Sequence, residues 1–169
     1  MQIIKYILLI LIFFLSAAIG IAVSKIFENR VKELREFRNN LNIMKNKIKF
    51  TYEPLKEIFC DIANESASAV EKIFEKISIK MENNQLKEVW ENSIQEADIS
   101  LNQEDKDIIK RLGKLLGQTD VDGQLSEIEL TESFLDIQIQ KAEEAKKKNQ
   151  KLYKTLGIVM GLVFVIILI

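Results

Sequence analysis

The chain has 169 residues, with 24 Lys or Arg against 25 Asp or Glu, one cysteine (Cys60) and no histidine. This near-neutral charge provides no basic surface for nucleic acid, and the lack of histidine removes the commonest general base and metal ligand. A lone cysteine excludes an intrachain disulfide and a thiolate zinc site. We therefore expect a non-enzymatic protein that binds no cofactor, no metal and no nucleic acid.

The first predicted element is an N-terminal transmembrane anchor over residues 1–24. Residues 6–23 form a run of eighteen residues without a charge. As a helix this run would be about 27 Å long, close to the ~30 Å hydrocarbon core of a bilayer. The alternative is a cleaved signal peptide, because Ala22, Val23 and Ser24 resemble a signal-peptidase site. Against cleavage, the run is longer than a usual signal core, and five basic residues follow within residues 25–38.

A long amphipathic helix is predicted to continue from this anchor. Its apolar residues recur every seven positions, and two more fill the alternate seam position of a heptad pattern. They are Phe27, Leu34, Leu41, Ile48 and Leu55, together with Phe37 and Met44. We expect the helix to run to about Tyr52, because Pro54 lacks an N–H and clashes with the preceding turn.

Shorter amphipathic helices are predicted next. Their apolar faces are Leu55, Ile58, Phe59 and Ile62, then Val70, Ile73, Phe74 and Ile77, then Leu86, Val89, Trp90 and Ile94. A fourth short helix is predicted to be capped by Asn102 and ended by Gly117, with Ile109 and Leu112 on its apolar face. We interpret Cys60 as a buried, unreactive thiol and Trp90 as a core aromatic residue.

The segment before the last helix partly resembles an EF-hand calcium loop. Residues of the required kinds are Asp120, Asp122, Gly123, Ser126 and Glu129. Gln118, however, stands where the first carboxylate ligand is required. We prefer an ordinary turn between helices, in which Asp122 caps the next helix and Gly123 relieves the turn.

The last helix is predicted from about Gln124 into a C-terminal transmembrane anchor over residues 155–169. Its buried face would consist of Ile128, Leu135, Ile139 and Ala142. This second apolar run is shorter than the first, so a tail inserted into one leaflet is the alternative to a full span. Because the elements contain no strand pattern, we predict an all-α, membrane-anchored helical bundle with two long antiparallel helices continuous with the two transmembrane segments.

Basic residues flank both apolar segments on the side of the middle region. Residues 25–38 contain five of them, and residues 141–154 contain six. Since basic residues near a span remain cytoplasmic, residues 25–154 are predicted to form a cytoplasmic domain of a two-pass protein in the cell membrane. The same residues are expected to contact membrane lipid through anionic headgroups.

Two surfaces are candidates for contacts. Small residues that allow close packing of membrane helices recur at helical spacing in both anchors: Ser16, Gly20 and Ser24, then Gly157 and Gly161. They would serve packing between the anchors of one chain or between copies in a homo-oligomer. Residues 98–136 carry ten acidic against four basic residues. Candidate partner-binding residues there are Asp98, Asp105, Asp107, Asp120 and Asp122, and a merely solvated surface is the alternative.

The order of these features resembles the stage III sporulation protein AB family of endospore-forming bacteria. The resemblance rests on the short N-terminal anchor, the helix with Leu34, Arg35 and Leu41, the kink at residues 52–55, Val89 and Trp90, residues 112–117, and Asp120. Its strongest part is Ala142 and Ala145 followed by residues 149–157 and an apolar tail. Each motif alone is weak, but together they cover nearly the whole chain.

The resemblance implies a helical domain on the mother-cell side of the membrane that faces the forespore, in a secretion-like channel complex with other membrane components. Family members are similar to the inner-membrane platform protein of type II secretion. By that analogy the domain would recruit or couple a secretion-type ATPase resembling stage III sporulation protein AA. The alternative function is an extracytoplasmic helical sensor or interaction domain anchored in the membrane.

Overall fold

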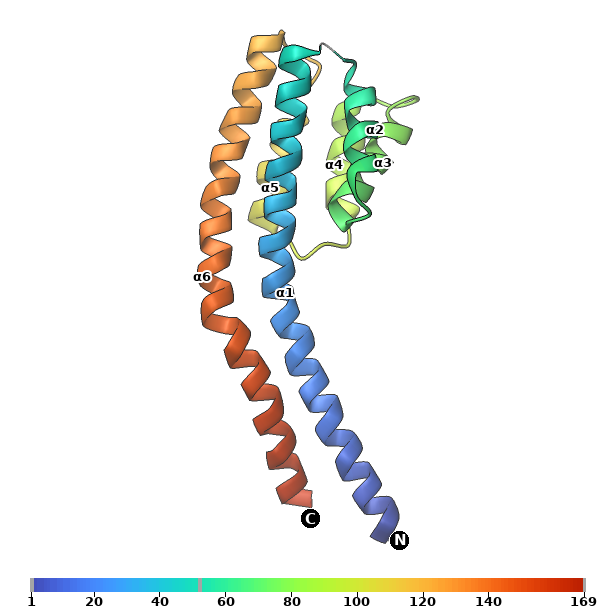
Figure 1. Cartoon of the computed structure of the whole chain (residues 1–169). Coiled ribbons are helices and arrows are strands. Elements are labelled where there is room, and N and C mark those ends of the chain that lie inside the picture. The colour runs from blue at the N-terminus through green and yellow to red at the C-terminus, as the bar shows by residue number, and fades with distance from the viewer. Residues whose placement is uncertain (1, 52, 169) are drawn as a thin grey trace. The chain divides into compact units, whose positions relative to one another are not determined.

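The computed structural model describes residues 2–51 and 53–168, which form six α-helices and no β-strand (Figure 1). The helices are α1 (Gln2–Phe50), α2 (Leu55–Glu65), α3 (Ala69–Lys80), α4 (Leu86–Glu96), α5 (Gln103–Leu112) and α6 (Val121–Leu168). The predicted all-α fold with a long helix at each end is thereby confirmed. Tyr52, the expected end of the first helix, and Ile169 lie outside the described residues.

The chain divides into two compact units. The first, which we call the anchor unit, consists of Met1–Val31 and Lys141–Ile169. The second, the helical domain, consists of Lys32–Gln140. The predicted anchors, residues 1–24 and 155–169, lie within the anchor unit, which also contains part of the basic stretches next to them.

The anchor unit exposes apolar side chains on most of its surface. Within the described residues, two helices are long and apolar enough to cross a membrane, with windows of mean hydropathy 2.8 in α1 and 2.0 in α6. Leu8, Leu15, Leu162 and Ile166 are among the exposed side chains of these segments. Helices that are apolar on nearly all sides and bury little against protein are suited to lipid. Both segments are therefore candidate membrane spans.

An aromatic cluster forms the centre of the helical domain. The ring of Trp90 on α4 lies 5.8 Å from that of Phe59 on α2 and 5.9 Å from that of Phe74 on α3. Phe74 lies 6.0 Å from Phe37 on α1. All four rings are fully buried, and the Trp90 indole N–H donates to the carbonyl of Ile109 at 2.9 Å. Trp90 is thus the core residue that the sequence predicted, and it joins α4 to α5.

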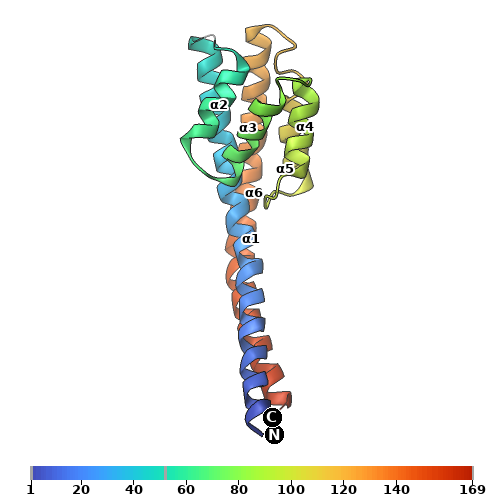
Figure 2. The same ribbon diagram turned by 90° about the vertical axis from the view of Figure 1, so that its right-hand side faces the viewer.

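The predicted heptad stripe of α1 is the surface on which the short helices pack. Leu34, Phe37, Leu41, Met44 and Ile48 are buried. Figure 1 shows α2, α3 and α4 on one side of the domain portion of α1, and Figure 2 is turned so that this side faces the viewer. The two ends of the stripe differ, because Phe27 belongs to the anchor unit and Leu55 begins α2.

Within the helical domain, α6 packs beside α1 in the antiparallel direction. The ion pairs between them include Arg38 with Asp136, at 3.0 Å, and Lys45 with Glu132, at 2.7 Å. Ile128 and Leu135 of α6 are fully buried, as predicted. The second ion pair is largely shielded from water, so removing one partner would leave a charge in a poorly solvated position.

The predicted end of α5 is wrong, because the helix stops at Leu112 and not at Gly117. Gly113 lies against the indole of Trp90, where a Cβ atom would come within 2.3 Å of the ring. The chain then continues in turns, with the N–H of Gln118 donating to the carbonyl of Leu115 at 3.1 Å. Gly117 adopts a φ of +72°, a left-handed conformation that favours glycine.

The start of α6 and the environment of Cys60 also differ from the predictions. Helix α6 begins at Val121, because the carboxylate of Asp120 accepts a hydrogen bond from the N–H of Gly123 at 3.1 Å. Asp120, and not Asp122, therefore occupies the capping position. Cys60 is half-buried. It lies beside the buried face of α2, which consists of Ile58, Phe59 and Ile62.

Candidate interaction sites

The two anchor helices approach each other most closely at Gly20 and Gly157. A Cβ atom on Gly20 would lie 2.7 Å from the carbonyl oxygen of Tyr153 and 2.8 Å from the Cα of Gly157. A Cβ atom on Gly157 would lie 2.8 Å from the Cα of Gly20. Only glycine fits on both sides of such a contact. The backbones therefore meet where the sequence places small residues, as in close packing of membrane helices.

Ser16, Gly161 and Ser24 extend this contact along the anchor unit. The hydroxyl of Ser16 donates to the carbonyl of Gly157 at 2.8 Å. Gly161 faces Phe13, whose ring would lie 3.0 Å from an added Cβ atom. Ser24 is fully buried. All five small residues named from the sequence thus lie in the anchor unit at or near the interface of α1 with α6.

A polar and aromatic contact follows the small residues within the same unit. The rings of Phe27 and Tyr153 are stacked, with centroids 5.6 Å apart and planes inclined by 16°. Gln150 donates a hydrogen bond to Glu28 at 3.3 Å. This contact involves the first residue of the predicted heptad stripe, which explains why Phe27 does not join the core of the helical domain.

The five candidate partner-binding aspartates occupy different environments. Asp98 and Asp122 are exposed, and Asp98 lines a cavity between α3 and α4. Asp107 is exposed and forms an ion pair with Lys110 at 2.7 Å. This bond and a hydrogen bond from Gln103 hold the pKa of the Asp107 carboxyl below its usual value.

Asp105 and Asp120 have structural roles at helix starts. Asp105 is fully buried in a capping box, in which its N–H donates to Asn102 at 2.8 Å and its carboxylate accepts from the N–H of Asn102 at 3.1 Å. Asp120 caps α6. The charges available to a partner are therefore those of Asp98, Asp107 and Asp122, together with the solvent-exposed part of Asp120.

Two of the buried glutamates of the helical domain, Glu33 and Glu71, have shifted pKa values. Burial raises the pKa of Glu33, although its carboxylate accepts a hydrogen bond from the N–H of Ser100 at 2.6 Å. Burial acts in the same direction on Glu71, but hydrogen bonds outweigh it and hold its pKa below the usual value. The donors to Glu71 are the side chains of Ser68, Ser66 and Asn40.

An exposed apolar stripe on α6 is a candidate site that the sequence predictions missed. It consists of Leu130, Phe134 and Ile137, which are 45%, 36% and 49% exposed. Their spacing of four and three residues puts them on one face of α6. The signal was present in the sequence, but the face with Ile128 and Leu135 accounted for the amphipathic pattern. Gln138, next to Ile137, donates to Glu104 of α5 at 2.8 Å, which ties this part of α6 to the acidic start of α5.

The loop that resembles an EF-hand is used to begin a helix. Asp122, Gly123, Ser126 and Glu129 all lie on α6 itself. A calcium-binding loop instead wraps its ligands around the ion before the second helix starts. Among the described residues, no group of three or more His, Cys, Asp or Glu side chains is arranged to hold a metal ion.

The fold and the glycine contact define the class: a helical-bundle protein with two candidate membrane spans. The chain belongs to the stage III sporulation protein AB family, because residues 5–169 match the family described as Stage III sporulation protein AB (spore_III_AB). It is 28% identical over 153 residues to Stage III sporulation protein AB of Bacillus subtilis (strain 168), a match that covers 88% of this chain and 90% of that protein.

A solved structure is similar as well. It is a Stage III sporulation protein AB (SpoIIIAB) chain with 25% sequence identity and a TM-score of 0.66. The match covers 71% of this chain and 98% of the solved chain. The family resemblance inferred from the residues is confirmed, and the chain is a sporulation protein.

Proposed function

We propose that this protein is a non-enzymatic platform in the secretion-like channel complex between mother cell and forespore, together with other membrane components of that complex. Its helical domain would recruit or couple a secretion-type ATPase resembling stage III sporulation protein AA. Family membership supports the sporulation role. The observation that carries the platform role is that one chain joins two candidate spans to a folded domain with an exposed apolar stripe.

The proposed topology places the helical domain in the mother-cell cytoplasm, in the membrane that faces the forespore. It rests on the basic residues that flank both candidate spans, because such residues remain cytoplasmic. They are Lys25, Arg30, Lys32, Arg35 and Arg38, then Lys141, Lys146, Lys147, Lys148, Lys151 and Lys154. Only Lys5 lies on the far side of either apolar run.

Membrane lipid is a proposed partner of the second basic stretch. A groove of about 530 Å³ on α6 is lined by Lys147, Lys148 and Lys151 at one end and by Leu152, Leu156 and Val159 at the other. Ammonium groups beside aliphatic side chains match an anionic headgroup and the start of its acyl chain. This arrangement supports a headgroup-level position for residues 147–151.

The docking surface that we propose for the ATPase is the α6 stripe with the acidic residues near it. Three apolar residues on one helix face are suited to a partner's amphipathic helix or groove. The acidic side chains would favour a partner surface that carries basic residues, and would mainly speed and orient the encounter. Asp107 on α5 and Glu129 on α6 are exposed and supply such charges.

ATP-driven movement of the partner could reach the anchors through α1 and α6, since neither helix is interrupted between Gln2 and Phe50 or between Val121 and Leu168. A flexible Gly-Ser insert between Ser24 and Glu28 tests this part of the proposal. Sporulation should fail although the protein is present at its normal level. Normal sporulation would refute transmission through α1.

Cysteine labelling in sporulating cells tests the topology. Cys60 is replaced by Ala, and Asn83, which is exposed in the turn after α3, is replaced by Cys. A membrane-impermeant maleimide should label the protein only after the cells are opened, with a permeant maleimide as the control for reactivity. Labelling in intact cells would overturn the platform and favour the extracytoplasmic sensor.

Binding to the purified ATPase tests the docking surface. With the full chain in lipid nanodiscs, Phe134→Glu should weaken binding by about tenfold, as expected for a central apolar contact. Phe50→Glu is the matched control, because Phe50 is exposed at the end of α1 and outside the stripe. Equal effects of the two substitutions would remove the stripe from the proposal.

A further inference from the structure

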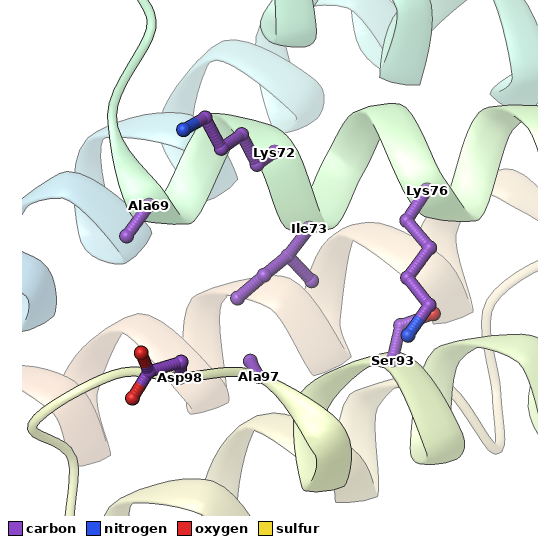
Figure 3. A pocket seen from close by; sticks show the side chains of 7 residues that line it. All are labelled: Ala69, Lys72, Ile73, Lys76, Ser93, Ala97 and Asp98. Carbon is purple, nitrogen blue, oxygen red and sulfur yellow. The ribbon is translucent and has the colours of Figure 1, made fainter.

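A cavity between α3 and α4 has features of a binding site that the proposed docking surface does not use. Its volume is about 420 Å³, and the residues that line it are Ala69, Lys72, Ile73, Lys76, Ser93, Ala97 and Asp98. Figure 3 shows Ile73 pointing from α3 into the space between the two elements, opposite Ala97. Since Ala69 and Ala97 are small, the centre of the cavity is apolar and unfilled by its own walls.

The hydroxyl of Ser93 is the most informative group in this cavity. Ser93 is 1% exposed, and its Oγ has no hydrogen-bond partner within the described residues. A serine on a helix usually bonds a carbonyl of the preceding turn, and a buried hydroxyl without a partner is destabilising. The Ser93 hydroxyl therefore lies in the cavity wall as a hydrogen-bond donor and acceptor that no group of the described residues uses.

Charged groups lie at both ends of the cavity. Lys76 reaches from α3 toward Ser93, as Figure 3 shows, and its ammonium donates to Glu96 at 2.6 Å. An ammonium group has three N–H donors, so this bond leaves capacity for a second acceptor. Lys72 lies one turn earlier on α3, and Asp98 follows Ala97 on the opposite wall. Neither Lys72 nor Asp98 forms an ion pair with another described residue.

We propose that this cavity receives a mixed-charge segment of the ATPase, which inserts one carboxylate side chain between Ser93 and Lys76. The proposal rests on the proposed function and adds a second contact with the ATPase to the docking surface on α6. The methylene groups of the inserted Asp or Glu would pack on Ile73 and Ala97. Its carboxylate would accept hydrogen bonds from the Ser93 hydroxyl and the Lys76 ammonium, which aim at the same space without bonding to each other.

The spacing of the polar groups favours a helical segment with opposite charges one turn apart. Ser93 and Ala97 are four residues apart, so the two ends of the cavity are separated by about 6 Å. A partner acid at the Ser93 end would therefore bring a basic residue, three or four positions away, to Asp98. Lys76 and Asp98 would disfavour the reversed orientation, because each would then face a like charge.

Three variants of the full chain in nanodiscs test the proposal by their affinity for the purified ATPase. Ala97→Trp fills the cavity, and Ser93→Ala removes only the buried hydroxyl. Lys76→Glu reverses the charge beside it. Asn84→Trp is the control for Ala97→Trp, because Asn84 is exposed in the turn between α3 and α4.

The Ser93→Ala variant separates a binding role from a structural one. Because the hydroxyl has no partner, the variant should unfold at the same denaturant concentration as the parent or a higher one. It should nevertheless bind the ATPase roughly tenfold more weakly, the effect of losing a hydrogen bond to a charged group. Ala97→Trp should weaken binding at least as much, and Asn84→Trp should not.

The outcomes distinguish the two proposals. If the parent binds the ATPase and both Ser93→Ala and Ala97→Trp bind it equally well, the cavity is not the site, while the platform function stands. If the parent does not bind the ATPase at all, the platform function and the cavity proposal both fall. Weaker binding by a Ser93→Ala variant of undiminished stability supports the cavity as the site.

Discussion

Replacing Gly113 by Ala should destabilise the helical domain far more than the change of one methyl group suggests. The added Cβ atom would lie 2.3, 2.5 and 2.9 Å from the Cδ1, Cγ and Cβ atoms of Trp90. Carbon atoms in contact prefer about 3.5–4.0 Å, so the indole must move by roughly 1 Å. It has no free space to enter, because the rings of Phe59 and Phe74 lie 5.8 and 5.9 Å away.

The cost has two parts and one offset. Overpacking of a filled core costs about 1–3 kcal/mol. A 1 Å shift would stretch the 2.9 Å bond from the indole to the Ile109 carbonyl beyond hydrogen-bond range, and an unsatisfied buried donor costs about 1–3 kcal/mol. Alanine restricts the unfolded chain and recovers about 0.4–1 kcal/mol, since Gly113 has helical backbone angles. Taken together, these ranges give a net loss of about 1–6 kcal/mol.

Denaturant unfolding of the full chain in detergent, followed by tryptophan fluorescence, measures this loss. The chain has one tryptophan, so the signal reports on the site of the clash. Gly113→Ala should unfold at a clearly lower denaturant concentration. Combining it with Trp90→Phe should add little further loss relative to Trp90→Phe alone, measured by circular dichroism. If Gly113→Ala unfolds at the parental midpoint, the packing described around Trp90 is wrong.

Three further predictions concern the buried glutamates and the anchors. Glu71→Gln should lower the free energy of unfolding at neutral pH by roughly 1–3 kcal/mol, and the loss should shrink as the pH falls through the lowered pKa of Glu71, as pH-dependent melting would show. Because the pKa of Glu33 is raised in the folded protein, the free energy of unfolding should fall as the pH rises through that pKa. Glu33→Gln should make this fall shallower and should not lower stability at neutral pH. Gly20→Leu should slow oxidative cross-linking of cysteines placed at Glu28 and Gln150, because the anchor helices must separate.

Each of these predictions has a control. Glu75→Gln changes an exposed glutamate on the same helix as Glu71 and should leave the melting profile unchanged. A pH profile of Glu33→Gln that parallels the parental one would contradict the role of that carboxyl. The cross-linking experiment is done in a Cys60→Ala background. Its control is Ile19→Leu, which alters a side chain that points away from the contact. If cross-linking is as slow in Ile19→Leu as in Gly20→Leu, the cross-linking rate does not depend on the glycine contact, and the prediction is wrong.

Periodicity and turn residues were sufficient to predict most of the fold. The seven-residue repeat from Leu34 to Ile48 identified the buried stripe of α1, and Asn102 marked the start of α5. The end of α5 could not be predicted, because Gly113 and Gly117 are equally good stop signals in the sequence. The indole of Trp90, twenty-three residues before Gly113, selects the first of them, and that contact exists only in the folded domain.

The candidate sites were predictable only in part. Small residues at four-residue spacing located both sides of the anchor contact, since close helix packing has a strong composition rule. No comparable composition rule tells which acidic residues of a helix are exposed. The sequence alone therefore could not distinguish the buried Asp105 from the exposed Asp107. The cavity at Ser93 could not be predicted from the sequence either. It exists because of which side chains of α3 and α4 face each other in the folded domain.

The residues of the anchor contact are synthesised at widely separated times during translation. Ser16 and Gly157 are separated by 141 positions, so at about 5–20 residues per second the first anchor waits roughly 7–28 s before its partner is synthesised. As a membrane span, it would have to remain in the bilayer during that interval on its own hydrophobicity. It is the more apolar of the two candidate spans, with mean hydropathy 2.8 against 2.0. The second anchor would then enter the bilayer beside a first helix that is already inserted and could pack against its Gly20 surface.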